Sequence, residues 1–186
     1  MVIERTSGSV AEITAKINGM ATSLNKIAYL ESILRQSADF DTKRFIWGKL
    51  GEFYEERKMY EKAAKAMATK AGIDFSVKDK TESYLRAAEL YATVGKIEDA
   101  DNMFGLALRD AGTDRKEMIK LAMKNIYRKN ADNLDKSGKK ATALKFYIRL
   151  IKSGIDDAEK KEIKARVIQI YNALGKFREA KLIEGI

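Results

Sequence analysis

Apolar residues recur along this chain at intervals of three and four, which is the spacing of one face of an α-helix. In the segment 23–36, for example, Ile27, Leu30, Ile33 and Leu34 share one face. Because the chain contains no proline, no helix interior is broken by a missing backbone donor. The pattern predicts helices at 10–18, 23–36, 41–57, 60–71, 80–94, 97–111, 114–136, 139–153, 157–174 and 176–184.

From about residue 44 onward, one motif recurs four times. The first copy has Trp47, Leu50, Gly51, Tyr54, Tyr60, Ala63 and Met67. The second has Tyr84, Ala87, Ala88, Tyr91, Gly95, Ile97, Ala100, Phe104 and Ala107. The third has Tyr127, Ala131, Leu134, Gly138, Ala143 and Tyr147, and the fourth has Val167, Tyr171, Gly175, Phe177 and Ala180. Aligned on their first helices, the copies start near 44, 81, 124 and 161, which predicts a stack of helical hairpins.

The first copy resembles the tetratricopeptide repeat (TPR), because it has Trp, Leu, Gly and Tyr at the offsets of that repeat and then Ala63. The spacings between copies exceed the roughly 34 residues of that family, and the proline that closes its repeats is missing. Longer and less regular hairpins are therefore implied. The resemblance implies an all-α fold, a right-handed array of antiparallel helical hairpins of the TPR-like solenoid type.

Residues at the ends of the predicted helices support this register. Three similar turns, centred on Gly95, Gly138 and Gly175 and each followed by lysine, place glycine where a helix ends in a left-handed residue. Three capping-box spacings mark expected helix starts, namely Asp79-x2-Glu82, Asp114-x2-Glu117 and Asp156-x2-Glu159. We therefore expect one TPR-like domain over 1–186, with a helical pair at 1–40 as a cap and repeats at about 41–78, 79–112, 113–155 and 156–186.

Composition removes most enzyme chemistry from consideration. The 186 residues include no cysteine and no histidine, which excludes disulfides, Ser-His-Asp triads and zinc sites built on those ligands. The glycines form no phosphate-binding loop, and no window supplies the ligands of a calcium loop. We therefore expect no enzyme activity, no catalytic residue, no metal and no cofactor.

The formal net charge of +9 comes from the last third of the chain, since residues 116–186 hold 18 lysines and arginines against 9 acidic residues. Helical spacing arranges part of this excess as a basic stripe, formed by Lys116, Lys120, Lys124, Arg128, Lys145 and Arg149. Such a stripe is either a solvated helix face or an electrostatic surface for RNA, an acidic protein or anionic lipid. Tyr127 interleaves it, at a spacing that favours a core position over base stacking.

A stack of helical hairpins offers a groove lined by the first helix of each pair, which suits a peptide or a partner helix. The groove candidates are Phe45, Lys49, Glu52, Glu56, Arg86, Glu89, Asn125, Arg128, Asp132, Arg166 and Gln169. A TPR clamp for chaperone C-termini is disfavoured, because Gly48 and Glu52 stand where that clamp has Lys and Asn, and Glu52 would repel a carboxylate. Trp47, Tyr54, Tyr91 and Tyr171 are expected between helices instead of in the groove.

These features predict a non-catalytic scaffold that binds another protein or peptide, with RNA as the alternative partner. No segment has the composition of a signal peptide or a membrane span, so we expect a cytoplasmic protein. The last helix has an apolar face formed by Phe177, Ala180 and Ile183, with Leu182 and Ile186 beside it. It either caps the array or stacks on a second copy, so we expect a monomer or a weak homodimer.

Overall fold

The computed structural model describes residues 9–36, 39–109 and 111–185, and over these residues the protein is all-helical without strands. The helices are α1 (Val10–Asn18), α2 (Ser23–Arg35), α3 (Phe40–Glu56), α4 (Tyr60–Ile73), α5 (Val77–Thr93), α6 (Ile97–Arg109), α7 (Thr113–Lys136), α8 (Lys140–Lys152), α9 (Asp157–Ala173) and α10 (Phe177–Glu184). Each predicted helix is therefore present, with ends that differ from the prediction by at most three residues.

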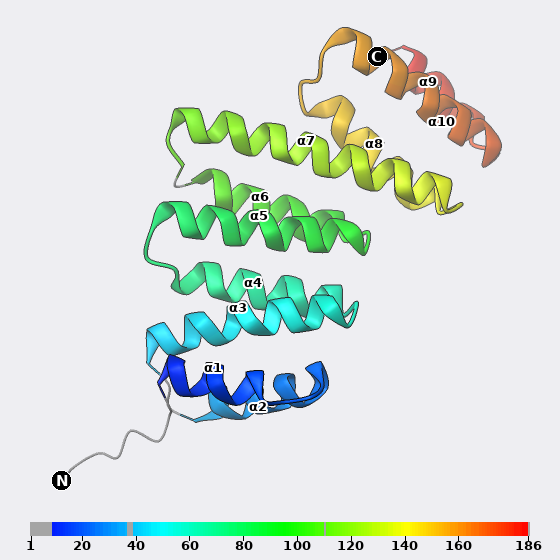
Figure 1. The fold of residues 1–186 in the computed structure, drawn as a ribbon. Helices are drawn as coiled ribbons and strands as arrows, with labels where there is room; N and C mark the ends of the chain where they lie inside the picture. The colour runs from blue at the N-terminus through cyan, green and yellow to red at the C-terminus, as the bar shows by residue number, and fades with distance from the viewer. Residues whose placement is uncertain (1–8, 37–38, 110, 186) are drawn as a thin grey trace. The chain divides into compact units, whose positions relative to one another are not determined.

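The chain divides into two compact units. Unit 1 comprises residues 1–94 and 98–111, and unit 2 comprises residues 95–97 and 112–186. Within unit 1, α3 packs against α4 and α4 against α5, while α2 packs on α3. Within unit 2, α7 packs against α8, α8 against α9 and α9 against α10. Helices that follow one another in the chain thus lie side by side and antiparallel within each unit, as in an array of hairpins (Figure 1).

The core of each unit is built from apolar residues one helical turn apart. In unit 1, Ile46 and Leu50 of α3 are fully buried, and Tyr54 continues the same face. In unit 2, Val167 and Ile170 are likewise buried on one face of α9. Because residues at this spacing share a helix face, each helix buries one stripe against its neighbours. Burying a side chain of this size stabilises the fold by about 1.5–3 kcal/mol.

Small residues allow the helices of a hairpin to approach closely. Gly51 of α3 is buried, and a Cβ atom there would lie 2.8 Å from the Sδ atom of Met67 on α4. The alanines at the corresponding crossings are buried as well; they are Ala63, Ala88, Ala100, Ala131, Ala143 and Ala180. A larger side chain at these positions would push the helix axes apart.

The aromatic residues of the motif are not equally buried. Tyr54, Tyr91 and Tyr127 are buried, and the ring of Tyr127 meets that of Phe146 edge to face, with 5.5 Å between their centres. Trp47 and Tyr171 are only partly buried, so the expectation that all four of Trp47, Tyr54, Tyr91 and Tyr171 lie between helices holds fully for two of them. The core position expected for Tyr127 is confirmed.

The predicted glycine turns are confirmed. Gly95, Gly138 and Gly175 have φ angles of 78°, 78° and 71°, in the left-handed region that favours glycine. After α7, the amide of Lys139 donates to the carbonyl of Leu134 at 2.9 Å. After α9, the amide of Lys176 donates to the carbonyl of Tyr171 at 2.8 Å. These backbone bonds satisfy carbonyls that the helix end would leave without donors.

The same turn follows α3, but its left-handed position is Lys58, with a φ angle of 58°. The amide of Met59 donates to the carbonyl of Tyr54 at 2.8 Å, which is the bond found after α7 and α9. The sequence pattern did not predict this fourth copy, because no glycine marks it. A side chain in this region costs free energy that glycine avoids.

The predicted aspartate N-cap is present at one helix, and at two helices another residue is the N-cap. Asp156 caps α9, and its carboxylate accepts a hydrogen bond from the amide of Glu159 at 2.8 Å. The N-cap of α5 is Ser76, which accepts from the amide of Asp79 at 3.0 Å, so this helix begins three residues earlier than predicted. The N-cap of α7 is Gly112, and Asp114 lies in the first helical turn, where its charge favours the helix dipole.

The last helix exposes part of its apolar face. Ala180 is buried and Ile183 is partly buried, whereas Phe177 and Leu182 are 63% and 69% exposed. Of the predicted apolar face, Ala180 and Ile183 are therefore covered to different extents, and Phe177 stays exposed. Ile186, which was expected beside that face, lies outside the described residues.

Replacing Lys58 by glycine tests the turn register. We expect Lys58→Gly to raise the free energy of unfolding by about 0.5–1 kcal/mol, because glycine adopts this φ without strain. Gly138→Ala is the matched control, since a Cβ at Gly138 would touch nothing within 4 Å and would act through the backbone alone. It should lower the free energy of unfolding. Urea denaturation of the two variants measures both changes, and a destabilised Lys58→Gly would contradict the turn geometry.

Candidate functional site

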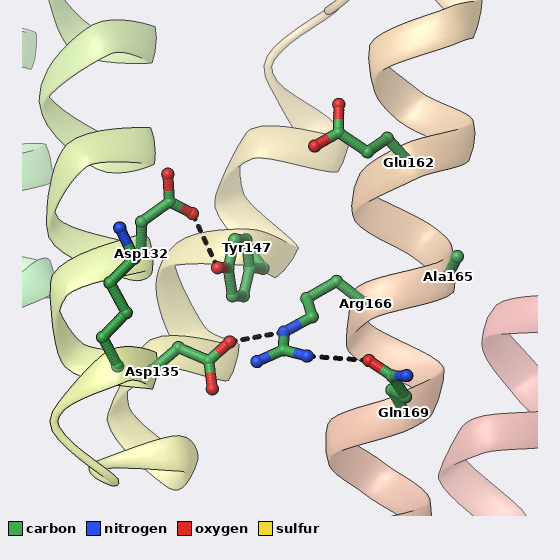
Figure 2. Close-up of a pocket in the computed structure, with 8 residues that line it drawn as sticks. Asp132, Asp135, Tyr147, Glu162, Ala165, Arg166 and Gln169 are labelled. Atoms are coloured by element: carbon green, nitrogen blue, oxygen red, sulfur yellow. Dashed lines mark hydrogen bonds and ion pairs between the residues drawn. The ribbon is translucent and has the colours of Figure 1, made fainter.

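A polar hollow of about 500 Å³ lies between three helices of unit 2. We call it the unit 2 hollow. Its lining residues are Asp132, Asp135 and Lys136 from α7, Tyr147 from α8, and Glu162, Ala165, Arg166 and Gln169 from α9. Figure 2 shows that Arg166 extends from α9 across the hollow towards Asp135. Three of the groove candidates, Asp132, Arg166 and Gln169, are brought together here.

An ion pair links the two walls of the hollow. The Nε atom of Arg166 donates to Oδ2 of Asp135 at 2.5 Å, and its Nη1 atom donates to Oε1 of Gln169 at 2.7 Å. The hydrogen bond to Asp135 raises the pKa of Arg166 above its ordinary value. The side chain of Asp135 is 4% exposed and that of Arg166 is 46% exposed, so a buried carboxylate is neutralised by a half-exposed guanidinium.

The second oxygen of Asp135 has no hydrogen-bond partner among the described residues. This Oδ1 atom is buried, and Asp135 forms part of the hollow wall. A buried carboxylate oxygen without a donor costs free energy, and water or a bound group can supply the missing bond. The wall of the hollow therefore contains a buried acceptor without a donor, beside the half-exposed side chain of Arg166.

Tyr147 forms the floor of the hollow. Its hydroxyl donates to Oδ1 of Asp132 at 2.7 Å, and the ring is buried. Burial raises the pKa of Tyr147 above its ordinary value, and the hydrogen bond and negative charge of Asp132 raise it further. The hydroxyl is consequently held in its neutral form and fixes the position of the Asp132 carboxylate.

A second set of ion pairs joins α7 and α9 beside the hollow. Arg128 donates through Nη1 to Glu159 and through Nη2 to Glu162, at 2.7 Å each. The hydrogen bond to Glu159 raises the pKa of Arg128 most, and the hydrogen bond to Glu162 raises it further. Together with Asp135–Arg166 they place one cation and one anion on α7, and one cation and two anions on α9, so ion pairs of both polarities join the two helices.

Unit 1 has a larger hollow of about 710 Å³, the unit 1 hollow. It is lined by Val10, Asp41, Arg44, Phe45, Gly48, Lys49, Glu52, Lys70, Asp74, Phe75, Ser76 and Asp79. The groove candidates Phe45, Lys49 and Glu52 lie in it, and Lys49 donates to Glu52 at 2.7 Å. Its α3 wall carries charge of both signs, with Arg44 and Lys49 between Asp41 and Glu52.

The same ion-pair arrangement occurs in both units at the same place in the repeat. In unit 1, Arg86 of α5 binds Glu55 of α3, 31 residues earlier, and Glu89, three residues later. In unit 2, Arg166 binds Asp135, also 31 residues earlier, and Gln169, three residues later. Lys49 and Glu52 occupy the corresponding positions on α3. The first helices thus carry a cation and an acceptor one turn apart on one face.

The remaining groove candidates lie outside the two hollows. Glu56 accepts a hydrogen bond from the hydroxyl of Ser23 on α2 at 2.6 Å, so it joins two helices of unit 1. Arg86 and Glu89 bind each other, as described. Asn125 is exposed on α7, and Arg128 is engaged by Glu159 and Glu162.

Several side chains of the basic stripe already form hydrogen bonds or ion pairs within unit 2. Lys120 pairs with Glu117 at 2.8 Å, and Lys124 donates to the carbonyl of Gly154 at 2.8 Å. Arg128 pairs with the carboxylates of Glu159 and Glu162. Lys116 and Lys145 are exposed, and Arg149 is partly buried. The buried ring of Tyr127 offers no surface on which a base could stack.

Several residues of the hollows were not predicted. In unit 2 these are Asp135, Tyr147 and Glu162. In unit 1, Lys70 donates to both oxygens of Asp74, at 3.0 and 2.9 Å, and the hydroxyl of Ser83 donates to Asp74 at 2.7 Å. The repeat register alone could have suggested Asp135, because it occupies the same repeat position as Glu55.

The described residues contain no group of three or more acidic side chains placed to hold a metal ion. Their helices also include none that combines the length and the apolar character needed to cross a bilayer. What the two hollows offer is hydrogen bonding and charge of both signs. A comparison of the sequence with models of protein families finds no match, and a comparison with curated proteins finds none either.

Arg166 and Arg86 occupy equivalent repeat positions, but the acid paired with Arg166 is buried and the acid paired with Arg86 is partly exposed. Replacing each arginine in turn compares the stability that the two ion pairs contribute. We expect Arg166→Gln to lower the free energy of unfolding by about 1–3 kcal/mol, because it leaves the buried Asp135 carboxylate without its cation. Arg86→Gln is the matched control, since its partner Glu55 is 36% exposed and such pairs contribute about 0–1 kcal/mol. Equal losses in chemical denaturation would contradict the role assigned to Asp135 burial.

The raised pKa of Tyr147 predicts a loss of stability at alkaline pH. In the unfolded chain a tyrosine loses its proton near pH 10, whereas folded Tyr147 retains it. The unfolded state therefore binds fewer protons than the folded state above about pH 10, and unfolding becomes more favourable as pH rises. We expect Tyr147→Phe to lose less stability than the wild type between about pH 9 and pH 11. Identical pH profiles would show that Tyr147 is not held neutral.

Proposed function

We propose that this protein is a non-catalytic interaction scaffold, a right-handed TPR-like array that binds a peptide or partner helix along the first helices of its hairpins. The observation that carries the proposal is the recurring arginine arrangement, Glu55–Arg86–Glu89 in unit 1 and Asp135–Arg166–Gln169 in unit 2. A polar pattern repeated on one face of successive first helices suits an extended partner, because each repeat can make the same kind of contact.

The hollows support a partner of mixed charge. The unit 2 hollow combines Asp132, Asp135 and Glu162 with Lys136 and Arg166, so neither sign dominates. Pre-ordered side chains reduce the entropy lost on binding, and the arginines here are already held in place by their acidic partners.

RNA binding is the alternative function, and the structure supports it less well. An RNA surface requires cations that are free to neutralise phosphates. Lys120, Lys124 and Arg128 are engaged within unit 2, which leaves Lys116 and Lys145 as exposed members of the basic stripe that pair with no described residue. Two separated lysines give little electrostatic attraction at physiological salt.

Selection of peptides from a random display library, with the whole chain as bait, tests the proposal. We expect enriched peptides whose affinity for the Asp132→Asn/Gln169→Ala variant is at least about tenfold weaker, since contacts at the centre of an interface carry most of its energy. Lys161→Gln, an exposed change on the same α9 helix, is the matched control and should leave the affinity unchanged.

Two results would contradict the scaffold. One is a failure of the library to yield any peptide that binds the folded chain. The other is recovery of nucleic acid with the purified protein, lost between about 50 and about 200 mM salt and unaffected by the Asp132→Asn/Gln169→Ala change, because that pattern indicates phosphate binding.

A further inference from the structure

Two phenylalanine side chains of unit 1 are exposed at the same place. Phe40, the first residue of α3, is 66% exposed, and Phe75, in the turn between α4 and α5, is 72% exposed. Both line a hollow of about 310 Å³, together with Gly72, Ile73, Asp74 and Lys80. We call this the aromatic hollow. Two adjacent exposed aromatic rings are uncommon on a soluble surface and are typical of interaction sites.

The rings are held in position by their neighbours. The guanidinium of Arg44 lies over the Phe75 ring, 4.8 Å from its centre, and the ammonium of Lys43 lies 6.0 Å from the centre of Phe40. Asp74, which precedes Phe75, is buried and bound by Lys70 and Ser83. The turn that presents Phe75 is therefore anchored to α4 and α5, and little ordering is needed when a partner binds.

The charge around the aromatic hollow favours an acidic partner. Most nearby carboxylates are already used, because Asp39 caps α3, Asp41 pairs with Arg44 and Asp74 pairs with Lys70. Asp79 is exposed. In contrast, neither Lys43 nor Lys80 pairs with a carboxylate of the described residues. The first turns of α3 and α5 add partial positive charge at the same edge.

We propose that the aromatic hollow binds an acidic peptide segment through one large apolar side chain. The apolar side chain packs between Phe40 and Phe75, and carboxylates on either side of it pair with Lys43 and Lys80. A peptide fits better than a lipid surface, because the two rings line a concave hollow of side-chain size, whereas insertion into a bilayer needs rings that project from a convex surface. This surface uses no residue of the unit 2 hollow, so its test and that of the scaffold proposal fail independently.

The probe is a fluorescein-labelled peptide with the sequence Glu-Glu-Trp-Glu-Glu and an amidated C-terminus, titrated with the full chain and followed by fluorescence anisotropy. We expect saturable binding that weakens as salt rises. Two comparison peptides, Glu-Glu-Ala-Glu-Glu and Lys-Lys-Trp-Lys-Lys, lack either the apolar anchor or the acidic charge. Each should bind at least about tenfold more weakly.

Variants assign the binding to the aromatic hollow. Phe40→Ala/Phe75→Ala should weaken binding by at least about tenfold, and Phe177→Ala, which truncates an equally exposed ring in unit 2, should not. Lys43→Gln/Lys80→Gln should weaken binding and reduce its salt dependence, whereas the exposed control Lys161→Gln should leave both unchanged. Far-UV circular dichroism checks that each variant remains folded, which is expected because the truncated rings are exposed.

Three outcomes would overturn the proposal. The first is equal affinity of the wild type and the Phe40→Ala/Phe75→Ala variant for the acidic peptide. The second is binding of the basic peptide as tightly as the acidic one. The third is sedimentation of the chain with vesicles of phosphatidylserine and phosphatidylcholine, abolished by the same double change, while the acidic peptide does not bind, since that result assigns the rings to a membrane surface.

Discussion

The interaction on which the proposed partner surface depends is the ion pair that an arginine of one first helix makes with an acid of the preceding first helix. Glu55 and Arg86 form it in unit 1, and Asp135 and Arg166 form it in unit 2. Each pair ties together two helices that are not consecutive in the chain, and in unit 2 both members of the pair also line the hollow. In unit 2 the acid is buried, so the pair also compensates a carboxylate that would be costly to bury alone. The corresponding position of the second repeat is Ala92, which offers no carboxylate.

Hairpin packing supplies the framework that makes these pairs possible. Buried alanines and Gly51 let paired helices approach, and left-handed turns return the chain within three residues. Within each unit, the two first helices are thereby joined through their polar side chains, α3 to α5 in unit 1 and α7 to α9 in unit 2. The hollows of units 1 and 2 follow from this arrangement, because the space between neighbouring first helices is bordered by long polar side chains instead of apolar ones. Charge of both signs at these positions makes the hollows suited to a partner with donors and acceptors of its own.

Much of the fold is predictable from the sequence, and the reasons are local. Helical periodicity locates every helix of the described residues, and the glycine turns set the register of three hairpins, because left-handed geometry strongly favours glycine. Local signals fail at Lys58, where a residue other than glycine adopts the left-handed conformation. They also fail at α5, where Ser76 caps the helix three residues before the predicted cap Asp79. The sites are less predictable. The groove register correctly brings Asp132, Arg166 and Gln169 together, but the Asp135–Arg166 pair joins residues 31 positions apart, and the exposure of Phe40 and Phe75 depends on how three helix ends meet.

The central claim is that the polar faces of the first helices form the partner-binding surface. It is tested most directly by recording ¹H–¹⁵N NMR spectra of the chain with and without a peptide selected against it. The account predicts that the largest shift changes occur at amides of α7 and α9 around Asp132, Arg166 and Gln169, together with the side-chain amide of Gln169. Shift changes confined to α8 and α10, with α7 and α9 unaffected around the hollow, would contradict it.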